Sequence, residues 1–182
     1  PTVVVLGAFG KNDSVSYPWF APAGLNRGGI VGAISVLNRL THAERDELYE
    51  GKINPIAQFP GEGIVAFGQK TLHAGTSALD RVNVARLTAY LRERFAVISR
   101  PFLFEPNDVG TRTNAKAVFD GFLANILQQR GIYDFAVVCD ETNNTPARID
   151  ANEFWIDVAI EPTKSAEFIY IPIRIVNTGE IA

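Results

Sequence analysis

The sequence predicts an α+β domain in which two long amphipathic helices pack on one face of a mixed β-sheet. Apolar residues recur at helical spacing over 81–99 and 113–130, and they alternate with polar residues over 154–161 and 167–176. Each predicted helix has one apolar face, and each predicted strand has one apolar side. Helices and sheet are therefore expected to bury these surfaces against each other.

Both long helices have sequence signals at their ends. The first follows Asp80, which we expect to be its N-cap, and it stops before Pro101. The second is followed by Gly131, a residue type that commonly caps helix C-termini. We expect one face of the second helix to pack against the isoleucine side of the last strand. The residues in this expected core contact are Phe119, Phe122, Leu123, Ile126, Ile169, Ile171 and Ile173.

The remaining elements are shorter. Thr41 is followed three residues later by Glu44, a capping-box pattern that predicts a polar helix over 42–50. Residues 7–29 are rich in Gly, Ser and Pro and are expected to be loop. Further strands are expected over 2–6, 53–59, 64–72 and 132–140.

The last expected strand, 167–176, has an unusual pattern. Isoleucines line one side, while Phe168 and Tyr170 lie on the other, which is more apolar than a solvated face requires. Pro172 lacks a backbone N–H, so this strand should lie at a sheet edge. We expect the strand to be under-paired in an isolated chain and the residues after Asn177 to be poorly ordered.

Composition limits the class of protein. Of the 182 residues, 47% are hydrophobic and 20% are charged, which is typical of a globular domain. No apolar run approaches the roughly 18 residues that cross a bilayer, and a net charge of −3 does not indicate nucleic-acid binding. The sequence lacks methionine and a secretory signal pattern, and we expect it to be a fragment of a longer protein. Its single cysteine, Cys139, fits a reducing compartment.

No pattern of catalytic, cofactor-binding or metal-ligating residues emerges. Residues 3–13 place glycines and a lysine after an apolar run, but the spacing fits neither a P-loop nor GxGxxG. His42 and His73 have no Cys or carboxylate partners at metal spacing. The polar residues over 140–153 are expected to form turn and cap hydrogen bonds. We therefore predict no enzymatic activity, no cofactor and no metal.

The helix over 81–99 has a locally basic face that includes Arg81, Arg86 and Arg92. One interpretation is a solvated face with internal ion pairs. The other is a docking surface for an acidic protein partner. Nucleic acid is disfavoured because no aromatic residues are interleaved on that face.

Five motifs, in order along the chain, resemble the tail sheath family of contractile phages and related particles. They are PWFAPAG (18–24), FPGEGIVAFGQKTL (59–72), DRVNVARL (80–87), FLFEPND (102–108) and GIYDFAVVCDETNNTPARIDANEF (131–154). The resemblance covers nearly the whole chain and implies the C-terminal, polymerising part of a sheath protein. Residues 1–30 are then a strand and loop leading out of a preceding region, and 31–182 are the C-terminal core domain.

The resemblance also implies a function. Family members form hexameric rings that stack as a helical sheath around a tail tube, and contraction drives the tube through the host envelope. The implied partners are further copies of the chain, the tail tube protein, the baseplate and the tail terminator, without direct nucleic-acid contact or membrane insertion. The implied location is the virion tail, assembled in the host cytoplasm. The alternatives are the sheath of a pyocin-like or type VI secretion-like particle, or a small α/β enzyme or ligand-binding module.

Two groups of residues are expected to carry assembly. In the family, terminal strands add to the sheet edge of a neighbour. This implies a strand-addition interface at Phe168, Tyr170, Pro172, Arg174 and Val176. The family places tube contact on a helix of this domain, and we favour 42–50 because it is short, polar and peripheral. The candidate tube contacts on the two helices are Glu44, Arg45, Glu47, Arg81, Arg86 and Arg92.

Overall fold

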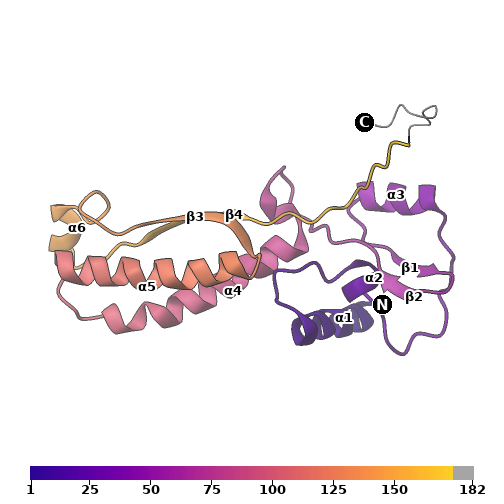
Figure 1. Ribbon diagram of the computed structural model, residues 1–182, viewed down its shortest axis with the longest axis horizontal. Helices are drawn as coiled ribbons and strands as arrows, with labels where there is room; N and C mark the ends of the chain where they lie inside the picture. Colours follow the sequence, from indigo (N-terminus) through magenta and orange to yellow (C-terminus); the bar gives the residue numbers. More distant parts are fainter. Residues whose placement is uncertain (174–182) are drawn as a thin grey trace, which may run out of the picture.

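The computed structural model describes residues 1–173, which form two lobes along one long axis (Figure 1). The helical lobe consists of α4 (Val82–Ile98), α5 (Val109–Gln128), β3 (Ile132–Val138), α6 (Pro146–Asp150) and β4 (Asp157–Pro162). The N-terminal lobe consists of α1 (Thr2–Val15), α2 (Gly24–Arg27), α3 (His42–Glu50), β1 (Ile56–Phe59) and β2 (Gly63–Ala66). Two 3-10 turns flank α4, namely η1 (Ala78–Asp80) and η2 (Arg100–Phe102).

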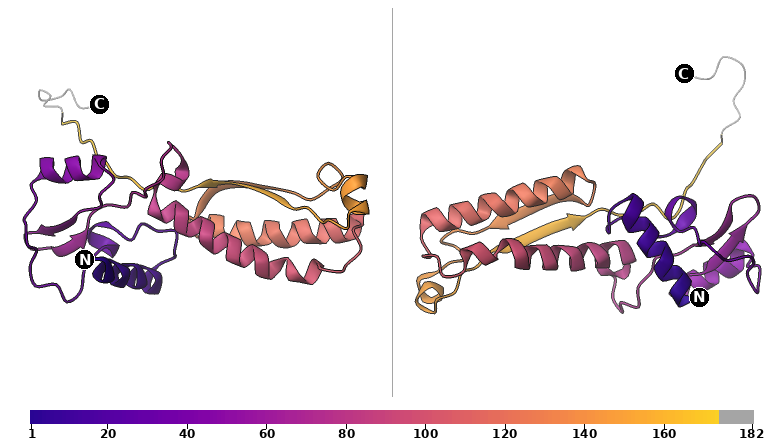
Figure 2. Two further views of the ribbon diagram at one scale, coloured as in Figure 1. Left: turned by 180° about the vertical axis from the view of Figure 1, so that it is seen from behind. Right: turned by 90° about the horizontal axis from the view of Figure 1, so that it is seen from below.

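The core of the helical lobe lies between the two long helices and one face of the β3–β4 hairpin (Figures 1 and 2). Helix α4 contributes Leu87 and Leu91, which are 1% and 3% exposed. The opposing surface comes from α5 and β3, and its fully buried residues are Phe119, Leu123, Ile126, Ile132 and Val137. The predicted α+β class, with two long amphipathic helices on one sheet face, is confirmed.

The strands form two separate antiparallel hairpins and not one mixed sheet. In the second hairpin Phe135 pairs with Ile160 and Val137 pairs with Val158. The expected final strand is absent as far as the structure describes it, because 163–173 have no regular secondary structure.

The expected packing of the last segment onto α5 is wrong. Ile169, Ile171 and Ile173 are 82%, 75% and 83% exposed. Residues of β3 and β4 cover the helices instead, including Phe135 and Val158. Alternation shows that a segment has an apolar side, but it does not show which surface covers that side.

The expected strand over 2–6 is also wrong. These residues form the first turns of α1, and Val3 and Leu6 are 81% and 60% exposed. The expected loop over 7–29 likewise contains the rest of α1 and all of α2. A short apolar run cannot distinguish a strand from a helix by periodicity. The domain boundary between residues 30 and 31 stays a prediction.

The two lobes are joined through the segment that follows α1. Trp19 is 4% exposed and donates its indole N–H to the Gln129 carbonyl at 3.1 Å. Its ring stacks on Tyr17 at a centroid distance of 4.8 Å and meets the edge of Tyr90 at 5.4 Å. One turn before Tyr90 along α4, Arg86 forms an ion pair with Asp13 of α1. Apolar burial and an ion pair therefore hold the N-terminal lobe against α4.

The helix ends differ in part from those expected. The capping box of α3 is confirmed, with Thr41 N–H donating to Glu44 at 2.7 Å. These hydrogen bonds hold the pKa of Glu44 below its ordinary value. Asp80, the expected N-cap of α4, lies in η1, and Arg81 occupies the cap position without a side-chain cap. Helix α5 begins earlier than expected, at an Asp108 cap that accepts from Thr111 N–H at 2.8 Å.

Gly131 follows α5 for a different reason from the one expected. The left-handed residue after the helix is Arg130, at φ 62°. The N–H groups of Arg130 and Gly131 bond to the carbonyls of Leu127 and Ile126 at 2.9 Å each, which is a Schellman ending. A Cβ on Gly131 would lie 2.7 Å from Cγ2 of Ile126 and 3.1 Å from Trp19 Nε1. Glycine is therefore required here for close packing.

Within residues 1–173, no helix combines the length and apolarity needed to cross a membrane. The same residues contain no cluster of three potential metal-ligating His, Cys, Asp or Glu side chains.

We predict that Gly131→Ala lowers the free energy of unfolding by about 1–3 kcal/mol, because the new methyl group overlaps Ile126 and the Trp19 ring. Gly121→Ala is the matched control, because a Cβ at this α5 position meets nothing within 4 Å. The control should raise stability by up to about 1 kcal/mol. Urea unfolding measures both. Equal effects of the two substitutions would contradict the packing role of Gly131.

Candidate assembly surface

The chain leaves β4 as an extended segment, residues 163–173, which we call the arm; it runs past the N-terminal lobe near α3 (Figure 1). Its first residue is held to the helical lobe. Thr163 donates its N–H to the Gly131 carbonyl at 3.1 Å and its hydroxyl to the Arg130 carbonyl at 2.9 Å. Asn83 of α4 donates to the Thr163 carbonyl at 3.2 Å. The arm therefore starts from a fixed point.

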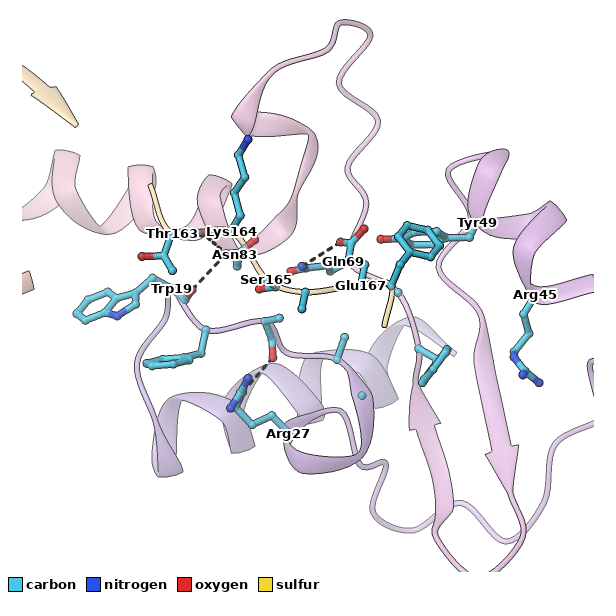
Figure 3. A pocket seen from close by; sticks show the side chains of 18 of the residues that line it. Trp19, Arg27, Arg45, Tyr49, Gln69, Asn83, Thr163, Lys164, Ser165 and Glu167 are labelled. Carbon is cyan, nitrogen blue, oxygen red and sulfur yellow. Dashed lines mark hydrogen bonds between the residues drawn. The ribbon is translucent and has the colours of Figure 1, made fainter. Parts of the chain in front are cut away.

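A second attachment lies four residues further along, at Glu167 (Figure 3). Arg81 donates Nε and Nη2 to the two carboxylate oxygens at 2.7 and 3.0 Å, a bidentate ion pair. Gln69 adds a hydrogen bond at 3.2 Å. We call this group, together with Tyr49, the Glu167 clamp.

The clamp shifts the pKa values of its members away from neutrality. Burial acts to raise the pKa of Glu167, but hydrogen bonds from Arg81, Tyr49 and Gln69 outweigh it and lower the pKa. Burial, together with the hydrogen bond and negative charge of Glu167, raises the pKa of Tyr49. Glu167 is thus held as the anion and Tyr49 as the neutral phenol. A general acid or base working near neutral pH needs the opposite trend.

Beyond the clamp the arm is apolar and exposed. Phe168 is 66% exposed and Tyr170 is 87% exposed, and the isoleucines between and after them are equally open. Phe168, Tyr170 and Pro172 of the expected strand-addition interface therefore lie on an accessible surface, whereas Arg174 and Val176 lie outside the described residues. A contiguous row of large apolar side chains marks an interaction site.

The β3–β4 hairpin presents a complementary feature. Within the described chain it has only two strands, so the outer edge of each lacks a neighbouring strand. Tyr133 of β3 and Trp155, just before β4, are 60% and 40% exposed. Two-stranded sheets are marginal unless more strands or a packing face support them. One face is covered here, and both edges can accept a further strand.

The candidate tube contacts on α3 are in different situations. Glu44 is used in the capping box. Arg45 donates to the Leu40 carbonyl at 2.9 Å and stacks over the Phe59 ring at 5.2 Å. Glu47 is exposed. Glu44 is exposed as well, but its carboxylate is engaged in the capping box, so Glu47 is the exposed α3 candidate without that role.

The candidate arginines of α4 are largely engaged within the chain. Arg81 belongs to the Glu167 clamp and also pairs with Asp80 at 2.8 Å. Arg86 pairs with Asp13 and lies over the Phe9 ring at 5.1 Å. Arg92 is exposed. Arg81 and Arg86 thus form ion pairs, but their partners, Asp80, Glu167 and Asp13, all lie outside α4.

The polar residues after β3 form the expected turn network. Asn144 donates to the Trp155 carbonyl and accepts from the Trp155 N–H, both at 2.9 Å. Asn107, before α5, donates to the Glu153 carbonyl at 2.9 Å and to Asn144 at 3.3 Å. Arg112, which is 7% exposed, holds Asn107 in place through a bond of 2.9 Å. These side chains close the far end of the helical lobe, so their role is structural.

A cavity of about 570 Å³ lies between the lobes, beside the arm (Figure 3). Its acidic and phenolic lining groups include Tyr49 and Glu167, whose pKa values are displaced away from neutrality. No described residue of its lining is a His or a Cys.

Sequence reasoning missed the clamp. Gln69 and Arg81 lie inside two of the motifs quoted above, but nothing local connects them with Tyr49 or Glu167. The hydrogen bond between Gln69 and Glu167 spans 98 residues. Only a periodic pattern was visible around Glu167, and such a pattern does not reveal a long-range partner.

Two family models match the chain. The model described as phage tail sheath C-terminal domain matches residues 75–176. The model described as phage tail sheath protein central domain matches residues 1–72.

Curated tail sheath proteins of phages are similar in sequence. The tail sheath protein of Vibrio phage KVP40 is 44% identical over 165 residues, covering 91% of this chain and 25% of the relative. The tail sheath protein of Enterobacteria phage T4 is 38% identical over 175 residues, covering 96% of this chain and 27% of the relative. The chain thus spans about a quarter of the length of the curated relatives that it matches.

Solved structures of contractile particles share the fold. A chain in the anti-feeding prophage baseplate superposes with a TM-score of 0.86 at 25% identity, covering 96% of this chain and 49% of that one. The anti-feeding prophage helical sheath in the contracted state gives 0.80 at 25% identity, covering 92% and 48%. A chain of the contracted PVC sheath complex gives 0.87 at 24% identity, covering 96% and 50%, a likeness of fold.

The sequence matches, the superposed folds and the order of the motifs agree, and the chain belongs to the phage tail sheath protein family.

Proposed function

We propose that this chain is a structural subunit that polymerises into a contractile sheath around a tail tube. The observation that carries the proposal is the exposed apolar arm of a chain in the tail sheath family. The start of this arm is fixed by hydrogen bonds at Thr163 and Glu167. The energy for contraction is stored in contacts between subunits and needs no active site. The displaced pKa values in the cavity support a role without catalysis.

Strand addition is the proposed mode of assembly. The arm of one copy pairs with an open edge of the β3–β4 hairpin in a neighbour and completes a larger sheet. Residues 168–182 could span up to about 50 Å if fully extended, enough to reach an adjacent subunit. The isoleucine side of the arm would then be covered by the partner, which explains why it is apolar although exposed in the single chain.

The clamp suits this mode of assembly. Main-chain ladders between subunits are strong, and they can persist while the bodies that they connect rotate. A ladder between subunits transmits force only if the start of the arm is anchored to its own subunit. Thr163 and Glu167 anchor the arm at two points. Contraction would then bend the chain beyond Glu167 and leave the lobes intact.

The remaining partners follow from the same role. The proposed partners are the tail tube protein, the baseplate and the tail terminator, and the proposed location is the virion tail, assembled in the host cytoplasm. Phage relatives at 38% and 44% identity favour a phage over a related injection particle, whose sheaths are matched at 24% and 25%. The proposed tube contact is Glu47 on α3, which keeps an exposed charge.

We predict that Ile169→Pro abolishes self-association without lowering the stability of the monomer, because Ile169 is 82% exposed and proline removes a ladder donor. Ile169→Val is the control and should associate normally, because it keeps the N–H and the β-branched side chain. Sedimentation and negative-stain microscopy measure the polymers. Normal polymers from the proline variant would rule out strand addition at this residue.

We predict that Glu167→Gln removes a pH-dependent part of the stability. The lowered pKa of Glu167 means that the folded state favours the anion, so the clamp stabilises the fold above the ordinary glutamate pKa. This stability is lost as the pH falls through the lowered folded-state pKa. The wild type should therefore exceed the variant by about 1–3 kcal/mol at pH 7, and the difference should shrink below about pH 4.

Urea unfolding between pH 3 and 7 tests the clamp, with exposed Glu62→Gln as the matched control. The control should follow the wild type throughout this range. A constant difference between wild type and Glu167→Gln across the range would show that the charge of Glu167 does not stabilise the fold.

We predict that Glu47→Lys weakens assembly around the tube while self-association stays unchanged. Exposed charge pairs are individually weak and screened by salt, so the loss should be about tenfold or less and should fade at high salt. Co-sedimentation with the purified tube protein measures it. Glu62→Lys, also exposed, is the control. If both variants bind the tube equally well, α3 is not the contact.

A further inference from the structure

The cavity between the lobes has walls of stacked aromatic rings and guanidinium groups. The Cζ atoms of Arg27 and Arg130 lie 5.0 and 6.0 Å from the centroid of the Phe20 ring. Arg45 lies 5.8 Å from the centroid of Phe67 on the opposite side. All five residues line the cavity. Such walls attract a ligand that carries a flat or apolar group together with a negative charge.

The charges and polar groups of this cavity are not fully matched within the chain. Among residues 1–173, none of these three arginines has a carboxylate within ion-pair distance. Gln69 and Asn83 are 4% and 3% exposed, and their side-chain oxygens are enclosed and have no hydrogen-bond donor among residues 1–173. A buried amide oxygen without a donor is costly. The cavity thus offers guanidinium groups that can pair with a carboxylate.

The turn between α4 and α5 has the matching chemistry. Phe104 is 105% exposed, the highest value among the exposed large apolar residues, and exposed Glu105 follows it. Phe104 also has a φ of 69°, a left-handed conformation that is strained for an aromatic residue. The other non-glycine residues with positive φ are polar, namely Lys52, Arg130 and Asn152.

The turn is held rigidly in this strained form. Leu103 N–H bonds to the Arg100 carbonyl at 3.1 Å, and Phe102 stacks parallel to Phe154 at a centroid distance of 6.3 Å. Asn107 closes the other side of the turn through the polar network at the end of the lobe. Strain that persists at a well-supported, exposed residue is a mark of a functional contact.

We propose that the Phe104–Glu105 turn of one copy docks into the cavity of the next copy in the sheath. The Phe104 ring would pack among the aromatic and guanidinium walls, and the Glu105 carboxylate would pair with an arginine there. This contact rests on the proposed self-assembly and adds to it a second interface, independent of the arm.

The geometry points to a second copy as the occupant. Asn83, at the start of α4, lines the cavity, whereas the turn follows the other end of this helix. The 17 residues of α4 separate the two by about 25 Å, so the turn cannot reach its own cavity. A contact between different surfaces of identical subunits does not close on itself in a dimer, and it can propagate as a helical polymer.

A first test separates a binding role from a structural one. Phe104→Gly should raise the melting temperature, because glycine adopts φ 69° without strain, and it should weaken self-association about tenfold or more. Val97→Ala, which trims another exposed apolar residue in the same lobe, is the control and should leave association unchanged. Phe104→Gly protein that associates like the wild type would overturn the proposal.

A second test locates the contact. The photoreactive amino acid p-benzoylphenylalanine at position 104 should form intermolecular cross-links, mapped by mass spectrometry, to peptides containing Phe20, Arg45 or Phe67. As a control, the same photoreactive group at exposed Leu79, near the start of α4, should form no intermolecular cross-links to these peptides.

Electron microscopy of the same samples separates the two proposals. Polymers that form while position 104 cross-links elsewhere, or not at all, would overturn the turn-to-cavity contact and leave sheath assembly standing. Absence of both polymers and cross-links at high concentration would count against both proposals. Cross-links to the cavity peptides, with association lost in Phe104→Gly, would support the contact.

Discussion

Burial of a single face of the β3–β4 hairpin is the constraint on which the rest of the structure depends. Two strands cannot enclose a core, so α4 and α5 supply the opposing surface through residues such as Leu87, Phe119 and Leu123. Once the helices cover this face, the other face and both outer edges stay open within the described chain. The interaction that makes the lobe stable thus leaves its edges open, as the proposed strand addition requires.

The arm shows how a chain can combine order and availability. Thr163 and Glu167 are fixed by hydrogen bonds to the helical lobe, to Arg81 and to Gln69. Directly after the clamp, Phe168 and Tyr170 are open to solvent. The conformational entropy of residues 163–167 is lost when the chain folds. In the proposed assembly, a neighbour that binds the arm would therefore need to order only the residues beyond Glu167.

Electrostatics separates the arginines of the chain into two groups. Arg81 and Arg86 are neutralised by Glu167 and Asp13 and stabilise contacts within the subunit. Arg27, Arg45 and Arg130 stack on aromatic rings around the cavity and lack such carboxylates among the described residues. Two amide oxygens of the cavity lining, those of Gln69 and Asn83, are enclosed without a hydrogen-bond donor among residues 1–173, which is a cost to the single subunit. In the proposed contact the Glu105 carboxylate would pair with one of the arginines of this group.

The sequence by itself determined the two long helices, the α3 capping box, the polar turn around Asn144 and the family, because these depend on local periodicity, local hydrogen bonds and motif order. Tertiary structure alone decided that residues 2–6 form a helix and that the isoleucine side of the arm stays uncovered. It also decided the partner of Glu167, which acts across 86 residues with Arg81. Such features depend on which surface meets which, and a one-dimensional pattern does not carry that information.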